Sequence, residues 1–153
     1  AKYQLAPIAR IIDLHWAGLD PAEMGLGPVH AATPLLTRHG LGLHDIDQWE
    51  INEAFAAQVL GCLRAWQDAA YCETQLGVAA LGRLNEGRLN VHGGAVAIGH
   101  PVGASGARIV LHLAHSLHQK SLEQNTGGPP ARGMAAICIG GGLGGAALLE
   151  AVQ

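Results

Sequence analysis

Glycine is concentrated in two short segments of this chain, and these segments constrain the fold more than any other feature. The chain has 22 glycines in 153 residues. One segment reads NVHGGAVAIGHPVGASGAR (90–108) and the other reads CIGGGLGG (138–145). Clustered glycine marks places where the backbone turns sharply or approaches a neighbour closely. We therefore expect two tight loops, the first directly before a helix and the second directly after a strand.

The spacing of apolar residues indicates strands that alternate with helices. The length fits one domain, which we place at residues 1–153. Alternation of this kind predicts an α/β domain, in which helices cover the faces of a sheet. A polar surface loop is expected at 120–132. The predicted strands are 4–15, 49–51, 134–139 and 146–152, and the predicted helices are 29–39, 53–66 and 105–118.

Composition and charge exclude several classes of protein. Charged residues make up 14%, below the roughly 25% of a typical soluble domain, so part of the surface is expected to be covered by a partner. The net charge is −3 and there is no basic stripe, which gives nucleic-acid binding no support. No apolar run approaches the roughly 20 residues of a membrane span. Three cysteines without C-x-x-C spacing argue against disulfides and a zinc site, and favour a reducing compartment, the cytoplasm.

His100 is the first candidate for chemistry, because it lies in the glycine-rich loop before the helix at 105–118. Pro101 follows it and favours an extended conformation, which would hold the imidazole in place. An imidazole titrates near ~6.5 and can accept a proton from a thiol. The alternatives are a loop that binds only phosphate and a histidine with a purely structural role. A dinucleotide-binding loop is disfavoured, because the G-x-G-x-x-G pattern and the acidic residue after a second strand are absent.

Cys138 and Asn52 are the other candidates, and each lies at the end of a predicted strand. The glycines after Cys138 would leave backbone N–H groups free to bind an oxyanion, and its thiol could act as a base or an acid. Alternatively, Cys138 is a small buried apolar residue. Asn52 either caps the helix at 53–66 or orients a water molecule or a carbonyl oxygen. In the first case Glu53 would favour the helix N-terminus electrostatically.

Taken together, three motifs resemble the C-terminal signature of thiolases, enzymes that make or break carbon–carbon bonds between acyl-CoA thioesters. The motifs are NEAFA (52–56), N-x-x-GGA-x-A-x-GHP-x-GASGAR (90–108) and C-x-GGG-x-G (138–144), in this order. The segment that begins LAPIARI also resembles the opening of the family's C-terminal domain, so the resemblance spans nearly the whole chain. It implies one half of the thiolase-like fold, a central mixed five-stranded sheet covered by helices.

The resemblance also implies a role for each motif residue. His100 would activate a nucleophilic cysteine and, with Asn52 acting through a bound water, form one oxyanion hole. Cys138 would take or return the α-proton of a second acyl-CoA. The backbone N–H of Gly140 would belong to a second oxyanion hole, and Phe55 would line the acyl-pantetheine channel. The substrates would be coenzyme A thioesters, with no metal or redox cofactor.

This sequence departs from the family in lacking the acyl-accepting cysteine, which thiolases carry in an N-terminal half. Neither Cys62 nor Cys72 lies in a comparable motif. We therefore expect the chain to be inactive alone, to need that N-terminal half and to form homo-oligomers in the full protein. It begins with Ala1 rather than Met, which hints at a fragment or a processed chain. The alternative is a non-catalytic thiolase-like module that binds acyl-CoA or a protein partner, and the presence of all three candidate residues favours the enzyme.

Overall fold

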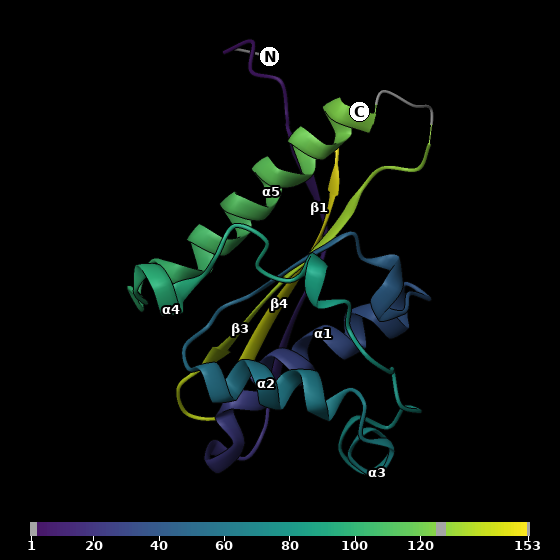
Figure 1. Ribbon diagram of the computed structural model, residues 1–153, viewed down its shortest axis with the longest axis vertical. Helices are drawn as coiled ribbons and strands as arrows, with labels where there is room; N and C mark the ends of the chain where they lie inside the picture. The colour runs from purple at the N-terminus through teal and green to yellow at the C-terminus, as the bar shows by residue number, and fades with distance from the viewer. Residues whose placement is uncertain (1–2, 125–127, 153) are drawn as a thin grey trace.

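A mixed sheet forms the centre of the molecule. The computed structural model describes residues 3–124 and 128–152. The strands follow the order β1-β4-β3-β2, in which β4 is antiparallel to both neighbours and β2 is parallel to β3 (Figure 1). The α/β class predicted from the sequence is confirmed. The strands are β1 (Ala9–Gly18), β2 (Gln48–Ile51), β3 (Arg132–Ile139) and β4 (Leu143–Ala151).

The expectation of five strands was wrong, because the described residues form a sheet of four. The place of a fifth strand beside β2 is taken by an isolated parallel bridge between Trp49 and Leu89. A 3₁₀ turn at Glu86–Arg88 comes directly before Leu89. Asn90 comes directly after it with a φ of 47°, a left-handed conformation. The extended segment between the turn and Asn90 is therefore too short to form a ladder.

Helices cover the two faces of the sheet. The helix α1, with α2 beside it, lies on one face, and the long helix α5 lies on the other (Figure 1). No helix among the described residues combines the length and apolar character needed to cross a membrane. The helices are α1 (Gly27–Arg38), α2 (Ala56–Ala65), α3 (Ala69–Tyr71), α4 (Ala95–Ile98) and α5 (Ser105–Gln124), with 3₁₀ turns at Pro21–Leu26 and Leu43–Asp45 and a π-helical turn at Cys72–Leu76.

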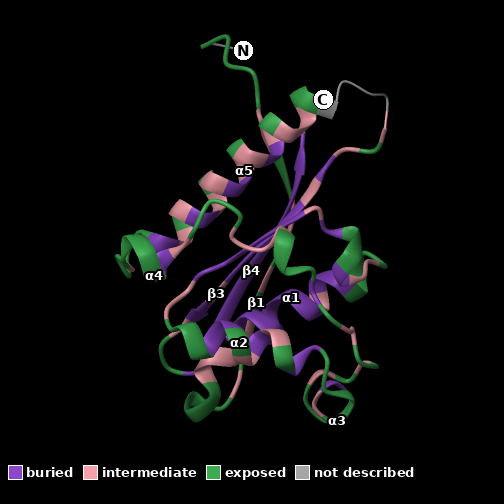
Figure 2. Ribbon diagram, viewed as in Figure 1, coloured by how far each residue is buried: buried purple, intermediate pink, exposed green. Residues whose placement is uncertain are grey.

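Two apolar clusters lie on opposite faces of the sheet, because successive side chains of a strand point to opposite sides. On β3, Met134 and Ala136 belong to the cluster under α1 and α2, whereas Ala135 belongs to the cluster under α5. The indole rings of Trp49 and Trp66 pack 5.3 Å apart in the first cluster. Buried residues line β2, β3 and β4 and the sheet-facing sides of α1 and α5 (Figure 2).

Several predicted boundaries differ from the structure. The first strand begins at Ala9 rather than residue 4, because β4, the strand it pairs with, ends at Ala151 opposite Ala9. The last strand begins at Leu143, so the glycine-rich turn is shorter than predicted. The helix α5 continues to Gln124, into the segment predicted as a loop. Residues 125–127 of that segment lie outside the described residues.

The helix after β2 begins at Ala56 rather than Glu53, so the alternative role of Asn52 as its N-cap was wrong. Phe55 occupies the N-cap position with an extended backbone (φ −146°, ψ 143°), and no side chain caps the helix there. Residues 52–55 therefore form a short non-helical link between β2 and α2, with a bend at Ala54. This link leaves the Asn52 side chain free for another role.

The second glycine-rich segment has two structural functions. Gly141 and Gly142 have φ values of 85° and 81° and form the turn between β3 and β4. Gly144 lies so close to the start of α1 that a Cβ atom would collide with the carbonyl oxygen of Gly27. Part of this segment is thus explained by turn geometry and close packing.

Candidate active site

Asn52 and His100 meet at the end of β2. The backbone N–H of Asn52 donates to the carbonyl of Ala136 over 2.9 Å, which anchors Asn52 to β3. Asn90 holds the other edge of β2, because its side chain accepts from the Ile51 N–H and donates to the Ile51 carbonyl, both at 2.9 Å. Asn52 Nδ2 lies 3.4 Å from His100 Nε2. Two residues that are 48 positions apart are thereby brought together as predicted.

Ser105 fixes the orientation of the His100 ring. Its hydroxyl donates to the carbonyl of Pro101 over 3.1 Å and lies 2.7 Å from His100 Nδ1. Because a hydroxyl has one proton, the Ser105 oxygen must accept from Nδ1–H. The neutral imidazole therefore presents the lone pair of Nε2 toward Asn52, whose amide donates to it. An imidazole held in this way is a base through Nε2.

Ser105 was not among the site residues predicted from the sequence. The signal was available, since Ser105 is the first residue of the predicted helix at 105–118 and follows His100 in the same motif. Ser105 is fully buried, and a buried hydroxyl requires hydrogen-bond partners. A serine at a helix start is more often read as a cap, which hides this role.

The side-chain oxygen of Asn52 has an unusual environment. Asn52 Oδ1 is buried and has no hydrogen-bond partner among the described residues. Asn52 also lines a cavity of about 170 Å³, together with Asn90, His92 and His112. Buried polar atoms normally have a partner. The arrangement therefore favours a bound water molecule that donates to Asn52 Oδ1.

Glu53 supports the same region in a way that the sequence did not predict. Its carboxylate accepts from Asn90 Nδ2 at 2.9 Å and from the backbone N–H of Val96 at 3.0 Å. It thus supports the start of α4 rather than the start of α2. Gly94 lies so close that a Cβ atom would collide with this carboxylate. The approach of Glu53 explains why glycine precedes α4.

Cys138 lies at the same end of the sheet as Asn52, near the C-terminal end of the neighbouring strand β3. It continues the row of Met134 and Ala136, which faces α1 and α2. Burial raises the pKa of its thiol. Among the described residues, no hydrogen bond joins Cys138 to Asn52 or His100. The structure therefore brings two of the three predicted side chains into contact and places the third on the adjacent strand.

Gly140 and Phe55 occupy exposed positions next to these residues. Gly140 is the first residue of the turn after β3. Phe55 precedes α2 and is 62% exposed. Ligands of α/β proteins commonly bind outside the carboxyl ends of the strands. Gly140 lies on the segment that follows the C-terminal end of β3, and Phe55 lies on the segment that follows the C-terminal end of β2.

The other two cysteines are free and buried. Burial raises the pKa of Cys62 to about 12, with a smaller contribution from the nearby Cys138. The thiol of Cys72 donates to the carbonyl of Ala65 over 3.3 Å. Among the described residues, no three His, Cys, Asp or Glu side chains are placed to hold a metal ion. Neither thiol resembles an exposed, ionised nucleophile.

Comparison with known proteins identifies the family. The family model described as the thiolase C-terminal domain matches residues 5–151. The chain therefore belongs to the thiolase family, as a C-terminal domain. It is 44% identical over 146 residues to the peroxisomal 3-ketoacyl-CoA thiolase of Encephalitozoon cuniculi. The matched region covers 95% of this chain and 32% of the relative. It is 41% identical over 143 residues to the cytosolic acetyl-CoA acetyltransferase of Mus musculus, which covers 94% and 30%.

Solved structures give the same result. The human mitochondrial 3-ketoacyl-CoA thiolase in complex with CoA matches with a TM-score of 0.76 and 36% identity, over 99% of this chain and 32% of that chain. The acetyl-CoA acetyltransferase of Bacillus anthracis matches with a TM-score of 0.75 and 36% identity, over 99% and 32%. The chain thus spans about a third of the length of these relatives.

Proposed function

We propose that this chain supplies the C-terminal catalytic half of a thiolase, which transfers acyl groups between acyl-CoA thioesters. The reaction would be thiolytic cleavage of a 3-ketoacyl-CoA or the reverse Claisen condensation. The observation that carries this proposal is the contact between Asn52 and His100. Ser105 accepts from Nδ1–H, so Nε2 is the basic nitrogen of His100, and within the described part of the chain it is held only by the long 3.4 Å contact with the Asn52 amide, which an approaching thiol proton can replace. The substrate class is supported by the names of the relatives, which are 3-ketoacyl-CoA thiolases and acetyl-CoA acetyltransferases.

The first step of the proposed condensation forms an acyl-enzyme. A cysteine of the N-terminal half gives its proton to His100 Nε2, and the thiolate attacks the thioester carbonyl of an acyl-CoA. The carbon–sulfur bond to CoA breaks, and the CoA thiolate takes the proton from His100. Cys62 and Cys72 are poor candidates for this nucleophile because both are buried. We therefore propose that the chain is inactive alone.

The second step forms the carbon–carbon bond. Cys138, after its thiol proton has left to solvent, takes an α-proton from a second acyl-CoA as the thiolate. The resulting enolate attacks the acyl-cysteine carbonyl and expels the cysteine as a thiolate, which then takes the proton from Cys138. Asn52, through a bound water, and the backbone N–H of Gly140 would stabilise the negative oxygens, and His100 would add a donor whenever its Nε2 carries a proton. Burial raises the pKa of Cys138, so its thiolate is a strong base. No metal or redox cofactor takes part in this scheme.

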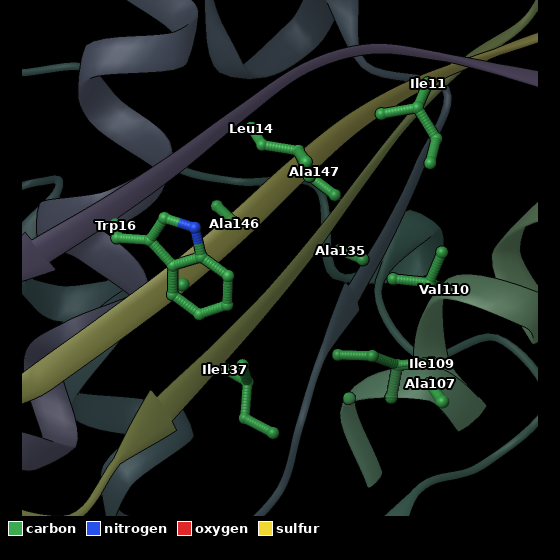
Figure 3. A pocket seen from close by; sticks show the side chains of 12 residues that line it. Ile11, Leu14, Trp16, Ala107, Ile109, Val110, Ala135, Ile137, Ala146 and Ala147 are labelled. Atoms are coloured by element: carbon green, nitrogen blue, oxygen red, sulfur yellow. The ribbon is translucent and has the colours of Figure 1, made fainter. Parts of the chain in front are cut away.

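An apolar groove on the α5 face offers a docking surface for the N-terminal half. Figure 3 shows Ile11, Leu14 and Trp16 of β1 facing Ile109 and Val110 of α5 across the strands β4 and β3. The groove encloses about 290 Å³, and the Trp16 side chain is 69% exposed. Exposed apolar patches of this kind mark interaction sites. Because the chain spans about a third of its relatives, we assign the groove to the segment equivalent to their remaining length.

Further partners follow from the same assignment. The exposed ring of Phe55 is available to line an acyl-pantetheine channel, so we propose that CoA thioesters pass it. We also propose that the complete protein is a homo-oligomer.

The three free thiols suit a reducing compartment, and we propose the cytoplasm. Relatives are named cytosolic, peroxisomal and mitochondrial, so the compartment needs a direct test.

The test is reconstitution with a cognate N-terminal half and an assay of acetoacetyl-CoA cleavage. We expect activity only in the mixture. The variant His100→Ala should lower kcat by roughly 10²- to 10⁴-fold, the usual contribution of a general base. The variant His115→Ala is a matched control, because His115 is an exposed histidine on α5. If the mixture binds CoA but has no activity, the chain is the non-catalytic module that binds acyl-CoA or a partner.

A further inference from the structure

A seam of buried polar side chains joins β2 to α5. On the face of β2 toward α5, Gln48, Glu50 and Asn52 alternate along the chain and are 5%, 4% and 2% exposed. The helix provides a partner for two of them. Ser116 Oγ donates to Gln48 Oε1 over 2.7 Å, and His112 Nδ1 lies 3.0 Å from Glu50 Oε1. The contact between Asn52 and His100 is the end of this seam.

His112 extends the seam to a third segment. Its Nε2 lies 3.2 Å from Nδ1 of His92, and the two rings are nearly perpendicular, at 84°. His92 belongs to the loop before α4. Glu50, His112 and His92 thus form a continuous row, which connects β2, α5 and this loop.

The two rings of the row can share only one additional proton without losing the bond between them. Because the Glu50 carboxylate accepts, Nδ1 of His112 carries a hydrogen, and Nε2 of neutral His112 then accepts from Nδ1–H of His92. A proton added to the free Nε2 of His92 leaves its Nδ1–H donating to Nε2 of His112, so the bond between the rings is kept. A second proton would set two N–H groups against each other and separate the rings. The hydrogen bond between the two rings is therefore kept when they hold one extra proton or none.

The row adjoins the Asn52–His100 pair. Glu50, His112 and His92 line the same cavity as Asn52, whose Oδ1 has no partner among the described residues. Asn52 follows β2 directly and is two positions from Glu50, so the row sets the separation between β2 and α5 next to the pair. The contact between Asn52 Nδ2 and His100 Nε2 is long, at 3.4 Å, and a small displacement would break it.

We propose that Glu50, His112 and His92 are positioning residues, which hold the Asn52 amide and the His100 ring in register and close the cavity beside Asn52. This inference rests on the proposed function. The other charged groups near the row have their own partners. Arg108 of α5 donates to the carbonyl of Gly99 over 2.9 Å, and Glu53 accepts from Asn90. Neither replaces a member of the row.

The test uses the reconstituted enzyme, with kcat and KM measured as functions of pH. The variant His112→Leu breaks the row and should lower kcat roughly tenfold or more, with KM within about twofold. In His112→Gln, the amide can donate to Glu50 and accept from His92. This variant should keep most of kcat and show a shallower fall of kcat on the acid side, because glutamine takes up no proton. The control His115→Leu should resemble the wild type.

Two results would overturn the proposal: an unchanged kcat in a folded His112→Leu, or equal losses in the leucine and glutamine variants with unaltered pH profiles. If the leucine variant does not fold, as judged by its Tm, His92→Leu gives the same test from the exposed end of the row. An inactive wild-type mixture would instead reject the proposed function. In that case NMR assignment of the ring tautomers decides the row itself: a hydrogen on Nδ1 of His112, facing Glu50, supports the row, and an Nδ1 without a hydrogen overturns it.

Discussion

The two faces of the sheet are built in different ways. The face under α1 and α2 is closed and apolar, with Trp49, Trp66 and Met134 fully buried in one cluster. The face under α5 combines a smaller apolar cluster, the polar seam and the open groove beside Trp16. One face therefore holds the domain together, whereas the other keeps polar and apolar groups available for a ligand and a partner.

The difference arises within single strands. In β2, Trp49 and Ile51 point to the closed face, and Gln48 and Glu50 point to α5. The period of two places adjacent residues in opposite environments. A short strand can thus contribute to both the core and the site. A substitution on one face should affect stability, and a substitution on the other should affect function.

The largest expected effect is on the closed face. Trp49→Ala removes a fully buried indole that packs on Trp66, so we expect the free energy of unfolding to fall by about 3–5 kcal/mol. Trp16→Ala, on the other face, removes a largely exposed indole and should cost less than about 1 kcal/mol. Urea unfolding of both variants measures the difference. Similar losses would show that the two faces contribute equally to stability.

On the α5 face, Ser105→Ala should reduce activity. It removes the hydroxyl that accepts from the His100 Nδ1–H. This hydrogen bond becomes charge-assisted once the ring is protonated. Such bonds contribute roughly 1.5–3 kcal/mol, which corresponds to a roughly 10- to 100-fold fall in kcat. Ser105→Thr retains the hydroxyl and should recover part of the loss. A kcat within error of the wild type in the alanine variant would show that Ser105 does not orient the imidazole.

Alanine substitutions at two adjacent glycines of β4 allow a direct comparison of the stability cost on the two faces. A Cβ at Gly144 would collide with the backbone of Gly27, which cannot move without displacing α1, so Gly144→Ala should cost roughly 1–3 kcal/mol. A Cβ at Gly145 would meet the Trp16 ring, which is exposed and can turn away. Gly145→Ala should therefore cost less than about 1 kcal/mol. Thermal unfolding of the pair checks this order, and a reversed order would contradict it.

Two buried carboxylates should give opposite pH dependences of stability. Burial raises the pKa of Glu50, and the charge of His112 opposes this shift only in part. The stabilising contribution of Glu50 is therefore present below its ordinary pKa of 4.5 and is lost as the pH rises through the raised pKa. Arg132 and Arg10 outweigh the burial of Glu150 and lower its pKa. Its contribution is present above 4.5 and is lost as pH falls through the lowered pKa.

Unfolding free energies from about pH 3 to about pH 8 separate the two residues. Glu50→Gln should flatten the loss of stability on the rising side, and Glu150→Gln should flatten the loss on the acid side. Leu111→Ala, at an exposed position of α5, should leave both slopes unchanged. A Glu50→Gln variant with the wild-type slope would mean that Glu50 is not buried as a charged group.

The sequence predicted the part of the fold that depends on local pattern. The positions of α1 and β3 were confirmed. Asn52 and His100, which the motifs of the family assign to one site, lie 3.4 Å apart in the structure, and their roles stay a prediction. The missing fifth strand was not predictable, because the length of the ladder at Leu89 depends on its turn and on Asn90.

The polar seam was missed for a similar reason. Trp49 and Ile51 give the segment 49–51 the pattern of a short apolar strand, which hides the alternation of Gln48, Glu50 and Asn52. Their partners lie far along the chain, since His112 is 62 residues from Glu50 and Ser116 is 68 residues from Gln48. A single sequence does not show that a helix will satisfy buried polar groups from such a distance, and without that knowledge a buried carboxylate is an improbable prediction.

The smallest expected effect tests whether the open groove is a docking surface. Gly106 lies in the first turn of α5 and lines the groove, and no atom lies within 4 Å of where its Cβ would be. Gly106→Ala should stabilise this chain by roughly 0.5–1 kcal/mol, because alanine favours the helix. Gly61→Ala in α2 is the matched control on the closed face, where the new methyl would make an ordinary contact with Leu26. If the N-terminal half packs into the groove, only Gly106→Ala should weaken reconstitution, although both variants gain stability; equal reconstitution would place the docking surface elsewhere.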